Sequence, residues 1–296
     1  MADPAVGSGR FAPSPTGELH LGSLIAAVGS FLDARHDGGR WLVRIEDLDT
    51  ARVVPGSASC ILRCLESLGL WWDGEVEYQS QRTDLYARAL EALGAGRRTF
   101  ECSCSRSDLE AEDGGAYPGT CRGGPTRAGP TALRFRVDEA ATIRFEDRLQ
   151  GWCEFRLRQL GDVVVRRRDG VAAYQLAVVV DDAAQGVTSV VRGADLLPST
   201  AWQIALSRAL GLPALTYAHL PIVVEPDGSK LAKSRRSVPV DPAHAAQWLW
   251  AALLQLRQDP PAELAREPPD RLVAWAIARW NAGPLSRLRT IPAEPR

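Results

Sequence analysis

Apolar and polar positions in the first hundred residues switch between the spacing of strands and the spacing of helices. Apolar residues three and four positions apart predict helices, and the short apolar runs between them predict strands. The expected elements are a strand at 10–12, a helix from Leu21 that Gly38 and Gly39 end, a strand at 41–45, a helix carrying 61–68, and a helix from a cap at Thr83 to about Leu93. Strands that alternate with helices predict a parallel sheet covered by helices.

The pattern changes between about residues 100 and 130, where cysteines and glycines replace any hydrophobic period. Strand alternation then returns, and from Ala173 the strand and helix pattern resumes. The expected later elements are strands at 133–137 and 152–157, a hairpin with its first strand at 163–168, strands at 187–191 and 221–224, a helix at 200–210 and a helical tail after Asp241. The chain is therefore expected to be an α/β protein with a doubly wound parallel sheet, split by an α+β insertion and followed by a short helical tail. We place the parts at 9–100, 101–172, 173–240 and 241–296.

Composition narrows the class of protein. The 296 residues carry a formal net charge of -1, which argues against a generally basic nucleic-acid coat protein. No apolar run approaches the roughly 18 residues that span a membrane, and the N-terminus lacks a charged flank followed by an apolar stretch. Six cysteines in so long a chain do not predict a disulfide framework. We therefore expect a reduced, cytoplasmic protein without membrane contact.

The segment 10–23, RFAPSPTGELHLGS, places a loop of prolines and glycine between the first strand and the first helix. The N-terminus of a helix offers unpaired N–H groups and a positive dipole end, so it suits a phosphate. His20 can donate a hydrogen bond to phosphate oxygens, and Gly22 lets a phosphate or flat group approach the backbone. A lone histidine here would be interpreted as a helix cap, but the whole segment favours a nucleotide site.

Two lysines, Lys230 and Lys233, are the only ones in the chain, against 33 arginines. Both lie in the segment 230–234, KLAKS, after a turn that contains glycine. A solvated basic loop is the alternative interpretation. However, the chain uses arginine for every other cation, so two neighbouring lysines indicate that a primary amine is required. An ammonium on a flexible stem can follow a phosphate during a reaction.

Cys102, Cys104 and Cys121 lie close together in the glycine-rich segment. Three thiols in a reduced protein can bind zinc, which takes four tetrahedral ligands. Asp108 or a water molecule could complete the set. Small buried apolar residues are the alternative interpretation, although this segment offers little core. Cys60 and Cys64 lie on an apolar helix and are expected to pack there.

The motifs together resemble the class I aminoacyl-tRNA synthetases, with HLGS and KLAKS at the places of the HIGH and KMSKS motifs of that family. The wording of 10–17 resembles the glutamyl branch, and four further segments match it: 45–50 (IEDLDT), 174–182 (YQLAVVVDD), 191–197 (VRGADLL) and 219–221 (HLP). The resemblance covers about residues 9 to 240. Ala232 departs from the serine usual in the second motif, which leaves both lysines in place.

The resemblance implies a Rossmann-like catalytic domain and a set of site residues. Catalysis would use His20, Lys230 and Lys233, and ATP with Mg²⁺ would meet His20, Gly22 and Lys233. The glutamate site would comprise Arg10, Phe11, Ala12, Pro13, Ser14, Glu46, Tyr174 and Arg192. In it, Arg10 and Arg192 would pair with carboxylates, Glu46 with the α-ammonium, and Tyr174 would add a hydroxyl. Tyr117 would be the fourth ligand of a zinc ion held by Cys102, Cys104 and Cys121.

Only 62 residues follow Ser234, too few for the helical anticodon-binding region of an ordinary glutamyl-tRNA synthetase. The chain therefore resembles truncated paralogues of that family. This implies a monomeric ligase that activates L-glutamate with ATP without tRNA and then glutamylates the queuosine base in the anticodon of tRNA(Asp). The alternatives are a synthetase domain that charges the acceptor end with help from another chain, a non-catalytic RNA-binding paralogue, and a small-molecule nucleotidyltransferase.

Overall fold

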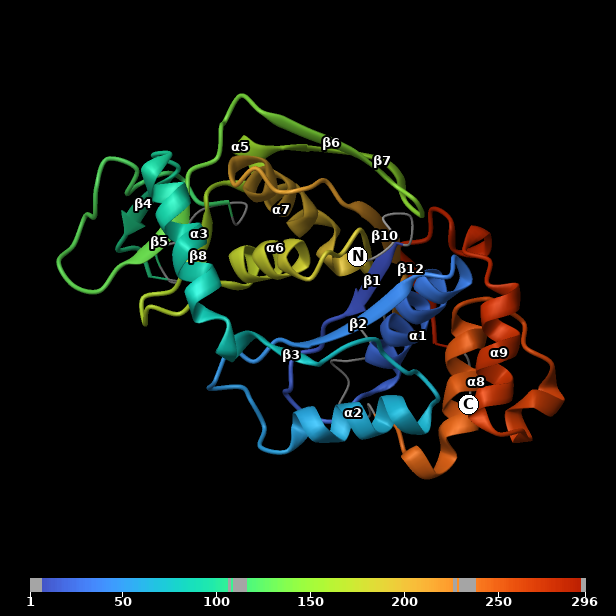
Figure 1. Ribbon diagram of the computed structural model, residues 1–296. Coiled ribbons are helices and arrows are strands. Elements are labelled where there is room, and N and C mark those ends of the chain that lie inside the picture. The colour runs from blue at the N-terminus through green and yellow to red at the C-terminus, as the bar shows by residue number, and fades with distance from the viewer. Residues whose placement is uncertain (1–6, 106–107, 109–115, 226–227, 229–237, 294–296) are drawn as a thin grey trace, which may run out of the picture.

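Parallel strands form the centre of the molecule (Figure 1). The computed structural model describes residues 7–105, 108, 116–225, 228 and 238–293. One sheet has the order β1 (Ser8–Phe11), β2 (Arg40–Ile45) and β3 (Glu77–Tyr78), and a second has the order β7 (Gly151–Arg156), β6 (Thr142–Asp147), β10 (Thr216–Leu220) and β9 (Ser189–Gly193). The N–H of Thr188 donates to the carbonyl of Ser8 at 2.9 Å, so β9 continues the sheet beside β1. Every strand pair in these two sheets is parallel except β6 with β7.

Helices cover both faces of this sheet (Figure 1). The side chains of β2 alternate between the faces, because successive residues of a strand point in opposite directions. Trp41 and Val43 pack in the cluster that contains α1 (Leu21–His36), whereas Leu42 packs on the other face with Ile204 of α7 (Leu197–Ala209). The other helices of the catalytic region are α2 (Ser57–Ser67), α3 (Thr83–Ala95) and α6 (Tyr174–Ala184), with short 3₁₀ turns at Gln79–Gln81 and Ala194–Leu196.

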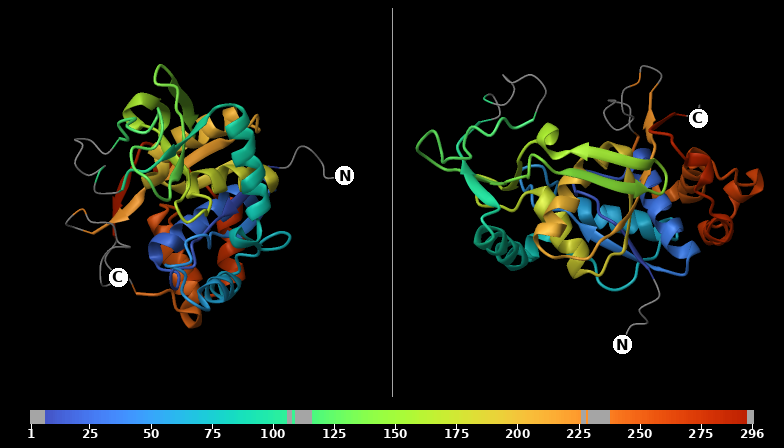
Figure 2. Two further views of the ribbon diagram at one scale, coloured as in Figure 1. Left: turned by 90° about the vertical axis from the view of Figure 1, so that its left-hand side faces the viewer. Right: turned by 90° about the horizontal axis from the view of Figure 1, so that it is seen from above.

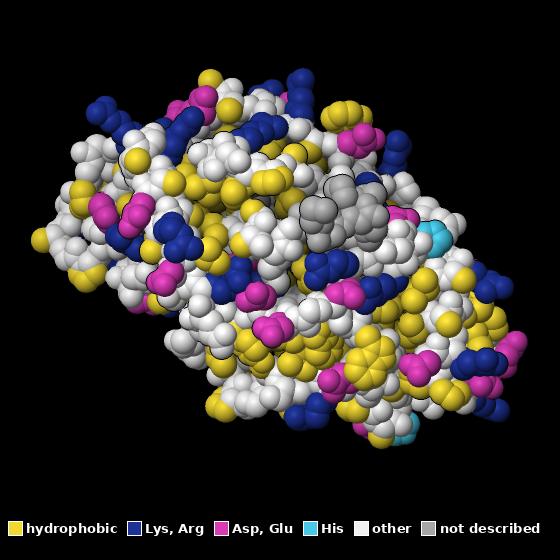
Figure 3. Space-filling model, in the orientation of Figure 1, with side chains coloured by type: hydrophobic (Ala, Val, Ile, Leu, Met, Phe, Trp, Pro, Cys, Tyr) yellow, Lys and Arg dark blue, Asp and Glu magenta, His cyan; other side chains and the backbone are white. Residues whose placement is uncertain are grey.

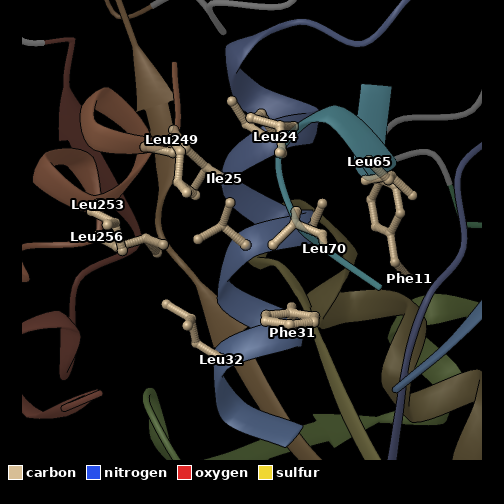
Figure 4. Close-up of a cluster of buried hydrophobic side chains, with 14 of the residues drawn as sticks. Phe11, Leu24, Ile25, Phe31, Leu32, Leu65, Leu70, Leu249, Leu253 and Leu256 are labelled. Carbon is tan, nitrogen blue, oxygen red and sulfur yellow. The ribbon is translucent and has the colours of Figure 1, made fainter. Parts of the chain in front are cut away.

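The C-terminal tail packs against α1 rather than standing apart. Leu249, Leu253 and Leu256 of the α8 region lie on the side of α1 that carries Ile25 and Leu32 (Figure 4). The tail comprises α8 (Ala245–Gln255), α9 (Pro269–Arg279), 3₁₀ turns at Pro242–His244, Ala262–Arg266 and Gly283–Leu285, and β12 (Thr290–Pro292), which pairs with β11 (Ile222–Val224). The tail is therefore part of the main hydrophobic core.

A small antiparallel sheet lies at the opposite end of the molecule from the tail helices (Figures 1 and 2). Its order is β4 (Thr99–Cys102), β5 (Ala132–Phe135) and β8 (Val163–Arg166), and a single turn of helix, α5 (Leu157–Leu160), precedes β8. The β6–β7 hairpin belongs to the inserted residues in sequence, but it extends the central sheet through β10. The predicted range 101–172 thus contributes to both sheets.

The predicted helices and most predicted strands are confirmed, and the differences are local. Thr83 is the first helical residue of α3 and not its cap, which is Arg82. The predicted strand at 187–191 lies two residues later, at β9, and 221–224 pairs with β12 outside the central sheet. The strands β3, β4, β6 and β10 were not predicted, and the tail contains a strand besides its helices. No helix in the described ranges is long and apolar enough to cross a membrane.

Candidate active site

Several of the predicted amino-acid-site residues lie where the strand order reverses, between β1 and β9. From β1 the chain proceeds outward to β2 and β3, whereas β9 and β10 lie on the other side. Open α/β sheets bind ligands at the carboxyl ends of the strands at such a reversal. Arg10 lies near the end of β1, Glu46 directly follows β2, and Arg192 lies near the end of β9.

A cavity of about 580 Å³ opens at the start of α1. Its lining includes Phe11, Ala12, Pro13, Ser14, His20, Gly22, Ser23, Gly193 and Asp195. His20 is the N-cap residue of α1 without a capping hydrogen bond from its side chain, and its Nδ1 lies 3.4 Å from Ser23 Oγ. Burial lowers the pKa of His20, so the neutral imidazole is favoured. A methyl group placed on Gly22 would meet only that imidazole, at 3.6 Å, which leaves the helix N-terminus open to a ligand.

A second cavity, of about 880 Å³, shares Ser14 in its lining with the first. Its lining also includes Glu46 and Tyr174, together with Arg52, Cys104, Arg134, Arg167 and Arg168. Burial raises the pKa of Tyr174, and the side chains that act on it electrostatically include Glu46, Arg192 and Arg10. The structure therefore brings together Tyr174, Glu46, Arg10 and Arg192 of the predicted amino-acid site. Lys230 and Lys233 lie outside the described residues.

Asp182 of α6 is the buried acid that joins the strands beneath the site. Its carboxylate accepts hydrogen bonds from Arg10 Nε and Nη2, at 3.2 and 3.4 Å, and from Arg44 Nη2 at 2.8 Å. All three residues are less than 5% exposed. Although burial opposes ionisation, the two guanidinium groups hold the pKa of Asp182 below its usual value. Arg10, Arg44 and Asp182 thus connect β1, β2 and α6 through one ion cluster.

The carboxylate of the neighbouring acid, Asp181, is also fully engaged in hydrogen bonds. It accepts hydrogen bonds from Gln79 Nε2 at 2.8 Å, Arg82 Nε at 2.7 Å and Tyr86 Oη at 2.8 Å. Glu46 differs from both aspartates, because its only ion-pair partner among the described residues is Arg44, at 3.7 Å. Burial raises the pKa of Glu46 to about 7, and the charges of Arg44 and Arg10 only partly offset that effect. Glu46 is therefore the carboxylate in the site that is available to a ligand cation.

Arg192 is a buried cation that has only neutral partners. Its Nη2 donates to Thr200 Oγ1 at 2.8 Å and to Gln203 Oε1 at 2.7 Å, and its Nε donates to His219 Nε2 at 3.2 Å. Among the described residues, Nη1 is buried without a hydrogen-bond partner, and no acid forms a salt bridge with this side chain. Desolvation lowers the pKa of Arg192, although the group stays protonated at neutral pH. An anionic ligand would supply the missing acceptor and the missing charge.

The three predicted cysteine ligands lie together, with every pair of sulfur atoms within 4.8 Å. Cys104 Sγ is 3.6 Å from Cys121 Sγ, close to the separation of about 3.8 Å expected for two thiolates on one tetrahedral zinc. Tyr117 Oη lies 3.5 Å from Cys102 Sγ, so the predicted fourth ligand joins the cluster. Burial opposes ionisation of Cys121, but hydrogen bonds from Ser103 and Tyr117 lower the pKa of this thiol to about 5. The donor set fits a zinc ion.

The alternative fourth ligand, Asp108, is already engaged. Its carboxylate accepts from the N–H and the hydroxyl of Ser105 at 2.6 and 2.7 Å, and it pairs with Arg127 at 2.7 Å. Arg134 supports the cluster instead, because its Nε donates to Cys102 Sγ at 3.3 Å and its guanidinium stacks 3.9 Å from the centroid of the Tyr117 ring. These contacts favour Tyr117 over Asp108.

The sequence interpretation missed four charged or titratable residues of the site: Arg44, Asp147, Asp182 and His219. Each is at most 3% exposed. An arginine in the apolar run of β2 and a pair of acids at the end of the apolar helix α6 were visible signals of buried ion pairs.

The face drawn in Figure 3 carries basic and acidic side chains interspersed, which agrees with the near-zero net charge.

Comparison with known proteins identifies the class. The model of the catalytic domain of class I tRNA synthetases (E and Q) matches residues 8–119 and 117–253. A glutamate tRNA ligase from Elizabethkingia meningosepticum, solved in complex with its amino acid, superposes with a TM-score of 0.77 at 25% identity, over 98% of this chain and 67% of that one. The fold and the site thus define a class I aminoacyl-tRNA synthetase catalytic domain, and the protein is a ligase.

Relatives narrow the class to one family. A glutamyl-Q tRNA(Asp) synthetase from Pseudomonas paraeruginosa is 51% identical over 287 residues, which is 97% of each chain. Another, from Dechloromonas aromatica, is 53% identical over 96% of this chain and 98% of that one. The chain belongs to the glutamyl-Q tRNA(Asp) synthetase family.

Replacing Asp182 with Asn should lower the free energy of unfolding by about 3 kcal/mol, because it leaves Arg10 and Arg44 buried without their shared counter-ion. Urea denaturation checks this. Asp49→Asn is the matched control, since Asp49 pairs with Arg52 at the surface and its loss should leave stability near that of the wild type. Equal effects of the two substitutions would contradict the assigned role of Asp182.

Proposed function

We propose that the protein activates L-glutamate with ATP, without tRNA, and then transfers the glutamyl group to the queuosine base in the anticodon of tRNA(Asp). The buried, unpaired Nη1 of Arg192 carries this proposal, because it calls for an anionic group within the amino-acid site. The name of the relatives, which match over nearly their whole length, supports the choice of acceptor.

The contacts of the two arginines support one assignment of the carboxylates of glutamate. Arg192 has a free terminal nitrogen and neutral neighbours, so it takes the side-chain carboxylate. Arg10 uses Nε and Nη2 on Asp182 and is the remaining candidate for the α-carboxylate. This division suits the chemistry, because the α-carboxylate is the nucleophile and a weaker hold keeps it reactive. Glu46 then pairs with the α-ammonium, and Ser14 and Tyr174 complete the site.

In the first step, an oxygen of the glutamate α-carboxylate attacks the α-phosphorus of ATP. A carboxylate–phosphorus bond forms, the bond to the bridging oxygen breaks, and pyrophosphate leaves with the electron pair. The N-terminus of α1 and His20 face the cavity in which the phosphates would lie, where they offset the charge that develops. Lys230 and Lys233 take the same role in this proposal. Mg²⁺ bound with ATP supplies further charge neutralisation.

In the second step, a hydroxyl of the queuosine ring attacks the carbonyl carbon of glutamyl-adenylate. The new ester bond forms, the hydroxyl proton is lost, and AMP leaves. The acceptor and the nucleotide need separate approaches to this carbon. The two cavities that share Ser14 in their linings are consistent with two such routes. A cytoplasmic location and a monomeric state stay predictions.

The acceptor is tested with radiolabelled glutamate, ATP and tRNA(Asp) that carries or lacks queuosine. We expect label only on the tRNA with queuosine, and, after nuclease cleavage, only in the anticodon fragment. Glutamate-dependent exchange of pyrophosphate into ATP should proceed without any tRNA. Label in the 3′ fragment, or on tRNA without queuosine, would indicate an acceptor-charging synthetase instead.

The affinity for glutamate should depend on the protonation of Glu46. Because the pKa of Glu46 is raised to about 7, this carboxyl group is mostly protonated at pH 6 and cannot pair with the substrate ammonium. The KM for glutamate in ATP–pyrophosphate exchange should therefore rise about tenfold from pH 8 to pH 6. Glu46→Gln should raise this KM at pH 8 and flatten the profile. Asp47→Asn, next to it at the surface, should keep the wild-type profile. A flat profile in the wild-type enzyme is the contradicting result.

Purified protein should contain about one zinc atom per chain, held by Cys102, Cys104, Cys121 and Tyr117. Cys102→Ser should lower the zinc content measured by metal analysis, and Tyr117→Phe should lose zinc to a chelator faster than the wild type. Cys60→Ser is the control, because Cys60 lies on α2, outside the cluster. A Cys102→Ser protein with full zinc content would exclude this ligand set.

A further inference from the structure

The first observation is a buried Asp–His pair directly behind Arg192, which the proposed chemistry does not use. Asp147 Oδ2 lies 2.5 Å from His219 Nδ1, and neither residue is more than 1% exposed. Asp147 is the last residue of β6. His219 lies in β10, the strand between β6 and β9 in the sheet. The pair is therefore inside the sheet and not in either cavity lining.

The hydrogen bonds around Asp147 fix the tautomer of His219. Asp147 Oδ1 accepts from the N–H groups of Leu149, Gln150 and His219 at 3.0, 2.8 and 3.1 Å, so the carboxylate is held as an acceptor. Its Oδ2 must then accept a hydrogen bond from a proton on His219 Nδ1. Burial lowers the pKa of His219 and outweighs the opposing effect of Asp147, so the ring is neutral and its Nε2 has only a lone pair.

That lone pair faces Arg192. His219 Nε2 lies 3.2 Å from Arg192 Nε and 3.1 Å from Thr200 Oγ1. On the same edge of the guanidinium, Arg192 Nη2 donates to Thr200 and to Gln203, whose amide is in turn fixed by a bond from its Nε2 to Gln175 Oε1 at 2.8 Å. Neutral acceptors thus bind one edge of the guanidinium. Among the described residues, Nη1 has no hydrogen-bond partner, and no acid forms a salt bridge with the cation.

We propose that Asp147 and His219 are positioning residues that set the orientation of Arg192, and that they thereby determine the preference of the site for glutamate over glutamine. A neutral acceptor is required, because an acid in the place of His219 would neutralise Arg192 and remove its need for a carboxylate. This inference rests on the proposed glutamate site and adds to it the residues that control its selectivity.

Asp147→Asn is the sharpest test, because it preserves shape while changing the proton arrangement. If the amide oxygen keeps the three backbone N–H bonds, the amide nitrogen donates to His219 Nδ1 and forces the proton to Nε2, where it opposes Arg192 Nε–H. The KM for glutamate in ATP–pyrophosphate exchange should rise about tenfold, whereas the KM for ATP should stay within about twofold. The ratio of kcat/KM for glutamate to that for glutamine should fall.

Two substitutions of His219 separate positioning from packing. The amide of His219→Asn can still donate to Asp147 but leaves Arg192 Nε without an acceptor, so it should reproduce the effect of Asp147→Asn. The longer His219→Gln can place its amide oxygen near the position of Nε2 and should keep the KM for glutamate within about threefold of the wild type. Asp241→Asn is the matched control, because Asp241 pairs with His244 at the surface.

Thermal unfolding is measured for each variant, and the kinetic comparison uses those that remain folded at the assay temperature. An unchanged KM for glutamate in Asp147→Asn, or equal losses in His219→Asn and His219→Gln, would overturn the proposal. So would a matching rise in the KM for ATP. Failure of the proposed function is distinguishable, because the wild-type enzyme would then show no glutamate-dependent exchange at all.

Discussion

The ion cluster at Asp182 is the interaction on which the arrangement of the site depends. The carboxylate of Asp182, which lies in α6, accepts hydrogen bonds from Arg10 of β1 and from Arg44 of β2. Such a cluster is stable only when every member is paired, because an isolated buried charge costs several kcal/mol. The cluster therefore fixes the ends of the two strands relative to α6. Tyr174 is the first residue of α6, and Glu46 directly follows β2. The ion cluster therefore also fixes the positions of Tyr174 and Glu46.

The charge balance divides the crevice into two unlike halves. Around Arg44 and Arg82, Asp181 and Asp182 supply the counter-charges: Arg44 Nε has no hydrogen-bond partner among the described residues but lies 3.8 Å from Asp181 Oδ2, and Glu46 is the carboxylate with a raised pKa. Around Arg192, the neighbours are hydroxyl, amide and imidazole groups, and the cation lacks a counter-ion among the described residues. One half accordingly offers a place for a ligand cation and the other a place for a ligand anion. A zwitterion with an additional carboxylate matches both, and its orientation follows from this asymmetry.

Much of the fold could be predicted from the sequence, because α1, α2 and α8 have long apolar faces that determine helix positions locally. The strand β6, with sequence TIRFED, carries charges at alternating positions, and its place in the sheet depends on β10, more than sixty residues later. Residues in the motifs, such as Arg10, Glu46 and Arg192, could be assigned to the site through the resemblance. Their partners could not, since the pairing of Arg44 with Asp182 or of Asp147 with His219 arises only when distant segments pack together.

This organisation also bears on the proposed activation of glutamate without tRNA. Asp182, Asp147, His219, Thr200 and Gln203 all come from the chain itself, and each is buried within it. A site whose side chains are already fixed by hydrogen bonds does not require an RNA partner to order them, so the binding energy of glutamate is not spent on that ordering. The tail supports the same state, because α8 packs on α1 and thereby braces the helix whose N-terminus opens into the first cavity. Preorganisation of the proposed amino-acid site would thus give a physical basis for the proposed separation of adenylate formation from the encounter with tRNA.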